Sequence, residues 1–221
     1  MEKMKAEVGR KLKTRSGDTI ELTDLLDEGL KRSLAELMEK ERDKVLTPEE
    51  LRAAQESMAY GCIKCADLSH TLLNDYVFSF DKMLEDRGNI AVYLLYACSC
   101  LCSITRNGGK DFSQLNNVLE TVKIKLGYEI ESKLAKTLLR LQEIKTLLKI
   151  SKGLLLHLLY EYCYKVCTTL SEFYDDCHCI AKNEYGVIIK VKCSRILLSE
   201  GTALILKECS YILGLEPAEE I

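Results

Sequence analysis

Apolar residues at helical spacing are the feature that most restricts how this chain can fold. Thr23 is a good N-cap with acidic residues after it, and leucines then recur every three or four positions up to the charged run 36–44. A second helix should start at Thr47, because Pro48 suits the first helical position and Glu50 completes a capping box. That helix should run to about Leu68. The spacing therefore predicts long helices from the first regular segment onward.

The same criteria predict helices over 91–104, 112–126, 131–149, 154–176 and 194–213, with Gly214 as the C′ residue of the last. One segment differs: a turn at 184–186 precedes the β-like stretch 187–192. With only 2 Pro and 12 Gly in 221 residues, helix interiors are rarely interrupted. The expected fold class is all-α, a helical bundle with a small β-hairpin or loop near 180–193.

The overall composition excludes several classes of protein. At 47% hydrophobic and 29% charged residues, the chain can build a core and is not a disordered tail. The formal net charge of −3 produces no global positive field that would attract nucleic acid. The longest apolar stretch, 154–159, is far below the roughly 20 residues that span a bilayer. Residues 1–15 are charged and do not read as a secretory signal, so the expected compartment is the reducing cytoplasm, without membrane contact.

Eleven cysteines could indicate a metal or redox site, but their spacing does not favour either. An odd number cannot pair completely, and the single CxxC, Cys62 to Cys65, has no second pair to complete a zinc site. Cys163 and Cys167 share a helix face, where buried thiols are more common than ligands. The best metal candidate is 177–179 (Cys-His-Cys) with Cys193, although adjacent ligands suit tetrahedral geometry poorly. We expect no metal, and a zinc or thiol-redox protein remains the third interpretation.

Motifs for hydrolytic or nucleotide-cleaving chemistry are absent from the sequence. It contains no HExxH, no G-x-S-x-G, no Walker A and no GxGxxG. His157 lies alone on an apolar helix and is expected to be a satisfied core residue. Tyr160, Tyr162 and Tyr164 lie on one helix; they could stack on unpaired RNA bases, but packing between helices with the hydroxyl at the rim is the more common role.

The basic stretch Lys11-Leu12-Lys13-Thr14-Arg15-Ser16-Gly17 is the first of a series of short stretches that run in order over essentially the whole chain. The series resembles eukaryotic cytoplasmic arginyl-tRNA synthetase, and this first stretch is similar to the family's degenerate KMSKS signature loop. Further similar stretches are 25–30 (LLDEGL), 40–47 (KERDKVLT), 60–64 (YGCIK), 66–70 (ADLSH), 74–84 (NDYVFSFDKML), 93–97 (YLLYA), 172–175 (EFYD) and 212–217 (ILGLEP).

The resemblance implies a class I ligase that uses ATP with Mg to activate arginine and charge its tRNA. Residues 1–74 would be the tail of the catalytic domain, and 75–221 the helical anticodon-binding domain. Lys11, Lys13, Thr14 and Arg15 would stabilise the charge that develops on the ATP phosphates. No HxGH motif occurs, so aminoacylation is expected to require the absent HIGH-motif Rossmann half, and the fragment alone is expected to bind no ATP. Arginine tRNA is the expected partner, with other synthetases or the missing catalytic half as further candidates and DNA excluded.

Tyr96 keeps a family position and is the expected contact to an anticodon base, and Arg106 the expected contact to a phosphate. Departures from the family pattern favour an alternative, a diverged non-catalytic interaction module that has lost its tRNA contacts. Cys100 and Cys102 stand where basic residues are usual, and the sequence ends in Glu219-Glu220-Ile221 where the family has Arg-Met. From residue 75 onward there are 18 basic and 19 acidic residues.

Overall fold

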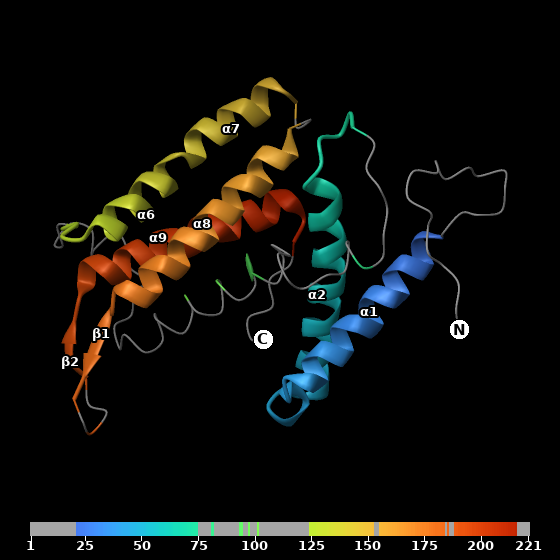
Figure 1. Cartoon of the computed structure of the whole chain (residues 1–221), viewed down its shortest axis with the longest axis horizontal. Coiled ribbons are helices and arrows are strands. Elements are labelled where there is room, and N and C mark those ends of the chain that lie inside the picture. The colour runs from blue at the N-terminus through green and yellow to red at the C-terminus, as the bar shows by residue number, and fades with distance from the viewer. Residues whose placement is uncertain are drawn as a thin grey trace.

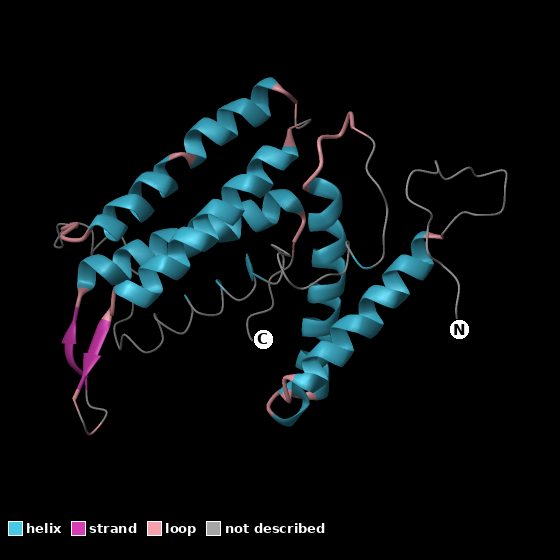
Figure 2. Cartoon of the chain, in the orientation of Figure 1, coloured by secondary structure: helices cyan, strands magenta, loops and turns pink. Residues whose placement is uncertain are grey.

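The described part of the computed structural model is almost entirely helical, as the sequence predicts (Figure 1, Figure 2). The structure describes residues 21–74, 81, 93–94, 97, 101, 124–152, 155–183, 185 and 188–215. Its elements in chain order are α1 (Leu22–Glu39), the 3-10 helix η1 (Arg42–Lys44), α2 (Pro48–Leu68), α6 (Glu129–Leu139), α7 (Leu141–Ile150), α8 (Leu156–Asp176), β1 (Ile180–Lys182), β2 (Ile188–Val191) and α9 (Cys193–Leu213).

Helices α1 and α2 form an antiparallel pair joined by η1 (Figure 1). Leu25, near the start of α1, packs with Ile63, near the end of α2. Leu37, near the end of α1, packs with Ala54 and Met58 in the first half of α2. Leucines at both ends of α1 therefore pack against α2.

Of the two helix starts predicted in the N-terminal part, the structure confirms that of α2 and corrects that of α1. Thr47 caps α2 as predicted: its backbone N–H donates to Glu50 Oε2 at 2.8 Å, and Glu50 N–H donates to Thr47 Oγ1 at 3.3 Å. The prediction for Thr23 is wrong by two residues. Glu21 is the N-cap of α1, and its N–H donates to Asp24 Oδ2 at 3.3 Å. An acidic residue three positions after the cap therefore decides the start of both helices.

Helices α6, α8 and α9 pack around the main hydrophobic core, and α7 lies along α8 (Figure 2). The predicted helix over 131–149 is two helices, α6 and α7, separated at Arg140. Cys62 and Cys65 of α2 belong to the same core as α8 and α9. The first helical pair is thus joined to the bundle through the second half of α2.

The predicted hairpin is confirmed: β1 and β2 pair antiparallel, with Ile180 opposite Val191 and an irregularity after Ala181. It extends from the end of the bundle where α8 ends and α9 begins (Figure 1).

Two predicted helices are described only in part. Within 91–104, the described positions Tyr93, Leu94, Ala97 and Leu101 are helical, and the last three are buried. Within 112–126 only the last three residues are described; they are not helical, so a helix reaching residue 126 is wrong.

A glycine inside α9 and the glycine that ends it should respond to alanine in opposite directions. Gly214 has φ +65° and ends the helix in a Schellman motif, in which Leu215 N–H donates to Ser210 O at 2.8 Å. Gly214→Ala is therefore expected to cost about 1 kcal/mol of stability through backbone strain. Gly201 lies inside the helix with nothing within 4 Å of an added Cβ. Gly201→Ala is expected to stabilise by about 0.5–1 kcal/mol. Urea denaturation measures both, and equal signs would contradict this explanation.

Candidate functional site

The six residues that the sequence marks as functional lie outside the described part of the chain: Lys11, Lys13, Thr14, Arg15, Tyr96 and Arg106. Their roles stay predictions. The nearest described neighbour of Tyr96 on that helical segment is Ala97, which is buried. Three residues before Tyr96, Tyr93 is exposed, and its hydroxyl oxygen accepts from Ser171 Oγ at 3.5 Å. The described part of this segment therefore has a buried face against the bundle and an exposed tyrosine.

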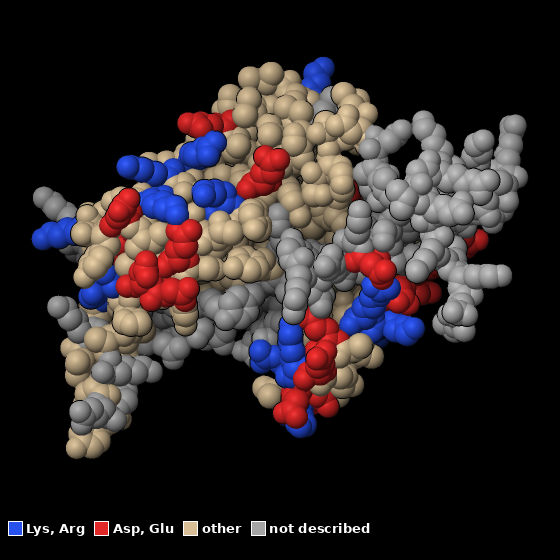
Figure 3. All heavy atoms as spheres, in the orientation of Figure 1, with Lys and Arg blue, Asp and Glu red and all other residues tan. Residues whose placement is uncertain are grey.

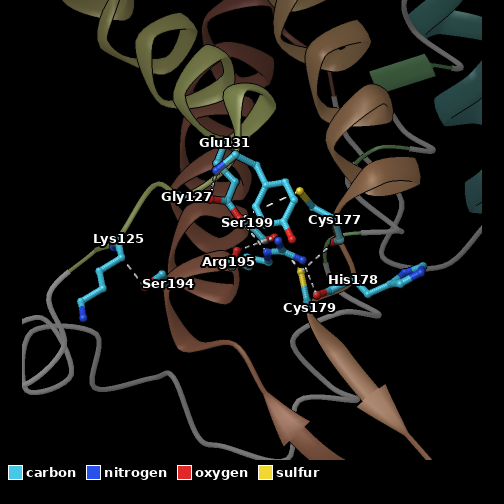
Figure 4. A network of polar contacts seen from close by, with 10 residues as sticks. Lys125, Gly127, Glu131, Cys177, His178, Cys179, Ser194, Arg195 and Ser199 are labelled. Atoms are coloured by element: carbon cyan, nitrogen blue, oxygen red, sulfur yellow. Dashed lines mark hydrogen bonds and ion pairs between the residues drawn. The ribbon is translucent and has the colours of Figure 1, made fainter.

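A buried ion pair lies at the centre of a network of polar contacts (Figure 4). Arg195 Nε donates to Glu131 Oε1 at 2.6 Å, and the two residues are only 5% and 4% exposed. Arg195 comes from the first turn of α9 and Glu131 from the first turn of α6. The pair therefore joins two helix starts that are 64 positions apart in the sequence.

Backbone groups complete this pair. The second carboxylate oxygen of Glu131 accepts from the N–H of Gly127 at 2.7 Å and of Tyr128 at 3.1 Å. Arg195 Nη1 donates to the carbonyl oxygen of His178 at 2.8 Å, in the turn between α8 and β1. The network thus fastens the base of the hairpin and the entrance of α6 to the start of α9 (Figure 4).

The pKa of Glu131 reflects two opposing effects. Burial alone would raise it, but the hydrogen bonds from Arg195, Gly127 and Tyr128 outweigh burial and hold the pKa below its usual value. Burial would likewise lower the pKa of Arg195, and Glu131 reverses this and raises it. Both groups are therefore charged at neutral pH, and the site is a structural ion pair rather than a proton donor and acceptor.

The segment 177–179 proposed as a metal candidate belongs to this network. Cys177 and Cys179 are buried, and burial raises the pKa of both thiols. Cys179 Sγ lies 3.9 Å from Ser199 Oγ, and Cys177 Sγ lies 4.0 Å from Glu131 Oε1. Among the residues that the structure describes, no three His, Cys, Asp or Glu side chains are grouped to hold a metal ion.

Four further described cysteines pack as apolar residues: Cys62, Cys65 and, as the sequence predicts, Cys163 and Cys167. All four are buried, and burial raises the pKa of Cys65 to about 12. The pKa of Cys163 is also raised far above its usual value, by its contact with Cys209 and by burial. Thiols that stay protonated are poor nucleophiles and poor metal ligands, so these positions are typical of core packing.

Two expectations about single side chains of α8 need correction. Tyr162 is buried, and its hydroxyl donates to the carbonyl oxygen of Leu138 at 3.1 Å inside the bundle rather than at the rim. Tyr164, by contrast, is exposed. His157 is not satisfied: its buried Nδ1 has no hydrogen-bond partner in the described part of the structure. Burial of the hydroxyl raises the pKa of Tyr162, which keeps it neutral.

The surface over α6 and α8 carries basic and acidic side chains in alternation rather than one strong patch (Figure 3). Lys133 of α6 pairs with Glu172 of α8, and Lys145 of α7 pairs with Glu208 of α9. Acids therefore neutralise part of the basic surface of the bundle. Within the described ranges, no helix is both long and apolar enough to cross a membrane.

Glu131 and Arg195 were missed by the sequence reasoning. Glu131 could have been noticed as an acidic residue at the third position of a helix, but nothing near Arg195 in the sequence indicates its partner.

Comparisons with known proteins cover nearly the whole chain. Residues 3–80 match the catalytic domain of class I tRNA synthetases (R), and residues 94–221 match the DALR anticodon binding domain.

The chain is 60% identical over 215 residues to a Drosophila melanogaster protein named probable arginine–tRNA ligase, cytoplasmic. That alignment covers 97% of this chain and 32% of the relative. The cytoplasmic arginine–tRNA ligase of Gallus gallus is 54% identical, over 96% of this chain and 32% of its own length. The chain thus spans about a third of the length of these relatives.

Solved structures agree with these matches. The arginyl-tRNA synthetase of Plasmodium falciparum superposes with a TM-score of 0.72 at 29% identity, over 91% of this chain and 34% of that one. The Thermus thermophilus enzyme shows the same fold, with a TM-score of 0.69 at 19% identity, over 96% of this chain and 34% of that one. The chain therefore belongs to the arginyl-tRNA synthetase family, and it matches the C-terminal part of these enzymes, including the DALR anticodon-binding domain.

Proposed function

We propose that this chain acts as the C-terminal part of a cytoplasmic arginine–tRNA ligase and binds arginine tRNA through its helical anticodon-binding domain. The match of residues 94–221 to the DALR anticodon binding domain is the observation that carries this proposal. The helical bundle and its hairpin are consistent with it. Tyr96 would contact an anticodon base, and Arg106 a phosphate.

The catalytic contribution of the chain would come from residues 1–74, the proposed tail of the catalytic domain, with the anticodon-binding domain beginning at residue 75. Lys11, Lys13, Thr14 and Arg15 would stabilise negative charge on the phosphates of ATP, which the complete enzyme would use with Mg. Because no HxGH motif occurs in the 221 residues, we propose that they do not charge tRNA on their own. Other synthetases, or the remaining catalytic part, are the proposed protein partners.

Binding of arginine tRNA at increasing salt concentration tests the proposal. The 221-residue protein should shift arginine tRNA in a gel at low salt. The affinity should fall as the salt concentration rises, because the counterions that binding releases then gain less entropy. Tyr96→Ala should weaken binding roughly 5- to 150-fold, the loss expected when one base no longer stacks on a ring. A tRNA for another amino acid serves as the specificity control. With ATP and arginine added, the same preparation should produce no charged tRNA, and measurable charging would contradict this part.

The charge balance favours one alternative, a synthetase-like module that has lost its tRNA contacts. Residues 75–221 carry 18 basic and 19 acidic residues. Electrostatic attraction to phosphates therefore adds little to the affinity of this segment for tRNA. If the wild-type chain binds no tRNA even at low salt, this alternative replaces the first function.

A further inference from the structure

The ring of Tyr128, at the entrance of α6, is open to solvent although it contacts the buried network. The residue is 58% exposed. Arg195 Cζ lies 4.9 Å from the ring centroid, and Lys192 Nζ lies 6.0 Å from it. Both distances are within the range of a cation–π interaction. An exposed aromatic ring with two cations beside it combines the two elements of single-stranded nucleic-acid sites, a stacking surface and positive charge.

The backbone holds this ring in place. Tyr128 N–H donates to Glu131, and Glu131 is fixed by Arg195. The loop that precedes Tyr128 is held as well, because Lys125 N–H donates to Ser194 Oγ, at the start of α9, at 3.2 Å. A ring that is already positioned loses little conformational entropy when a base stacks on it.

The two cations approach the ring from the same element. Lys192 is the N-cap of α9 and Arg195 lies three residues later, so they are neighbours on one side of that helix. The charge of Arg195 is neutralised by Glu131, whereas Lys192 has no ion pair in the described part of the chain. Lys192 is therefore the cation available to a phosphate. The side chain of Lys125 points away from the network in Figure 4, and the residue is exposed.

The local positive charge is modest, because the acidic residue Glu129 beside Tyr128 is exposed too. This balance argues for a stacking contact assisted by one phosphate contact, and against a surface that binds by charge alone. The competing explanation is that Tyr128 only covers the buried ion pair. In that case the ring would contribute to stability and nothing to RNA affinity.

We propose that Tyr128 is an RNA contact of this domain: its ring stacks on an unpaired base of bound tRNA while Lys192 meets the neighbouring phosphate. The inference rests on the proposed tRNA binding and adds a contact at the entrance of α6. Stacking on an aromatic ring tolerates any base, so the contact supplies affinity and orientation rather than sequence specificity.

Tryptophan fluorescence offers a direct test, since the chain contains no Trp. The Y128W variant carries a single reporter at the proposed contact. The Y211W variant is the matched control, because Tyr211 is 84% exposed near the opposite end of α9. Titration with arginine tRNA should quench the emission of Y128W and leave that of Y211W unchanged. If tRNA shifts both variants in a gel but the emission of Y128W does not change, the inference is wrong while the proposed function stands.

Affinity measurements complete the test. Tyr128→Ala should weaken tRNA binding roughly 5- to 150-fold with an unchanged salt slope, and Tyr128→Phe should bind like the wild type. Lys192→Ala should reduce the salt slope by about one unit, as expected for one phosphate contact. A Tyr128→Ala variant that is less stable yet binds tRNA normally would overturn the inference in favour of the covering role. Absence of tRNA binding by the wild type would remove the proposed function, and this inference with it.

Discussion

Glu131→Ala is expected to lower the free energy of unfolding by about 3–5 kcal/mol, which is the usual cost of removing one partner of a buried ion pair. Arg195, which is only 5% exposed in the wild type, would lose the anion that its guanidinium contacts. The N–H groups of Gly127 and Tyr128 would lose their acceptor at the same time. Three chain segments meet at this carboxylate, so the hairpin base and the entrance of α6 would both loosen.

Glu172→Ala is the matched control, because Glu172 forms an ion pair with Lys133 in which the side chains are 49% and 42% exposed. Exposed pairs contribute about 0–1 kcal/mol, so this variant should be nearly as stable as the wild type. Urea denaturation followed by circular dichroism measures both. Equal losses in the two variants would show that the buried pair contributes no more than an exposed one.

The same pair predicts how stability depends on pH. The pKa of Glu131 is lowered in the folded state, so the unfolded chain binds the proton more tightly. The stabilisation is fully present above the unfolded pKa of about 4.3 and is lost as pH falls through the folded value. The stability difference between wild type and Glu131→Gln should therefore be constant from about pH 7 to pH 5 and shrink below about pH 4. A difference that grows on acidification would contradict the lowered pKa.

The helix positions were largely predictable because their signals are local. The reciprocal hydrogen bonds of Thr47 and Glu50, and the left-handed Gly214, depend on residues a few positions apart. The error at Thr23 has the same origin. Asp24 lies three residues after Glu21 but directly after Thr23. Its hydrogen bond with the N–H of Glu21 selects the earlier start.

Features that depend on distant partners were not predictable. The separation of α6 from α7 at Arg140 has no Gly or Pro to mark it, and packing of both helices on α8 decides it. Glu131 and Arg195 meet only in the folded bundle. The candidate RNA and ATP residues came from the family resemblance rather than from local physics, and they lie outside the described residues, so experiments on Tyr96 and the basic loop have to test them.

Phe173→Ala is the second substitution with a large expected effect, again about 3–5 kcal/mol. Phe173 is 0% exposed near the end of α8 and belongs to the core that α8 shares with α9 and with Cys62 and Cys65 of α2. Truncation removes the whole phenyl ring from a closely packed interior, and the neighbouring side chains can fill only part of the cavity.

The next residue supplies the control for this substitution. Tyr174 is 52% exposed on the same turn of α8, so Tyr174→Ala makes nearly the same change of side chain without opening a cavity. It should change the free energy of unfolding by no more than about 0.5 kcal/mol. Urea denaturation of both variants separates the packing of the core from the helix propensity of alanine, which the two substitutions share. Similar losses in both would mean that Phe173 stabilises α8 locally; a loss confined to Phe173→Ala would show that the core joining α2, α8 and α9 holds the domain together.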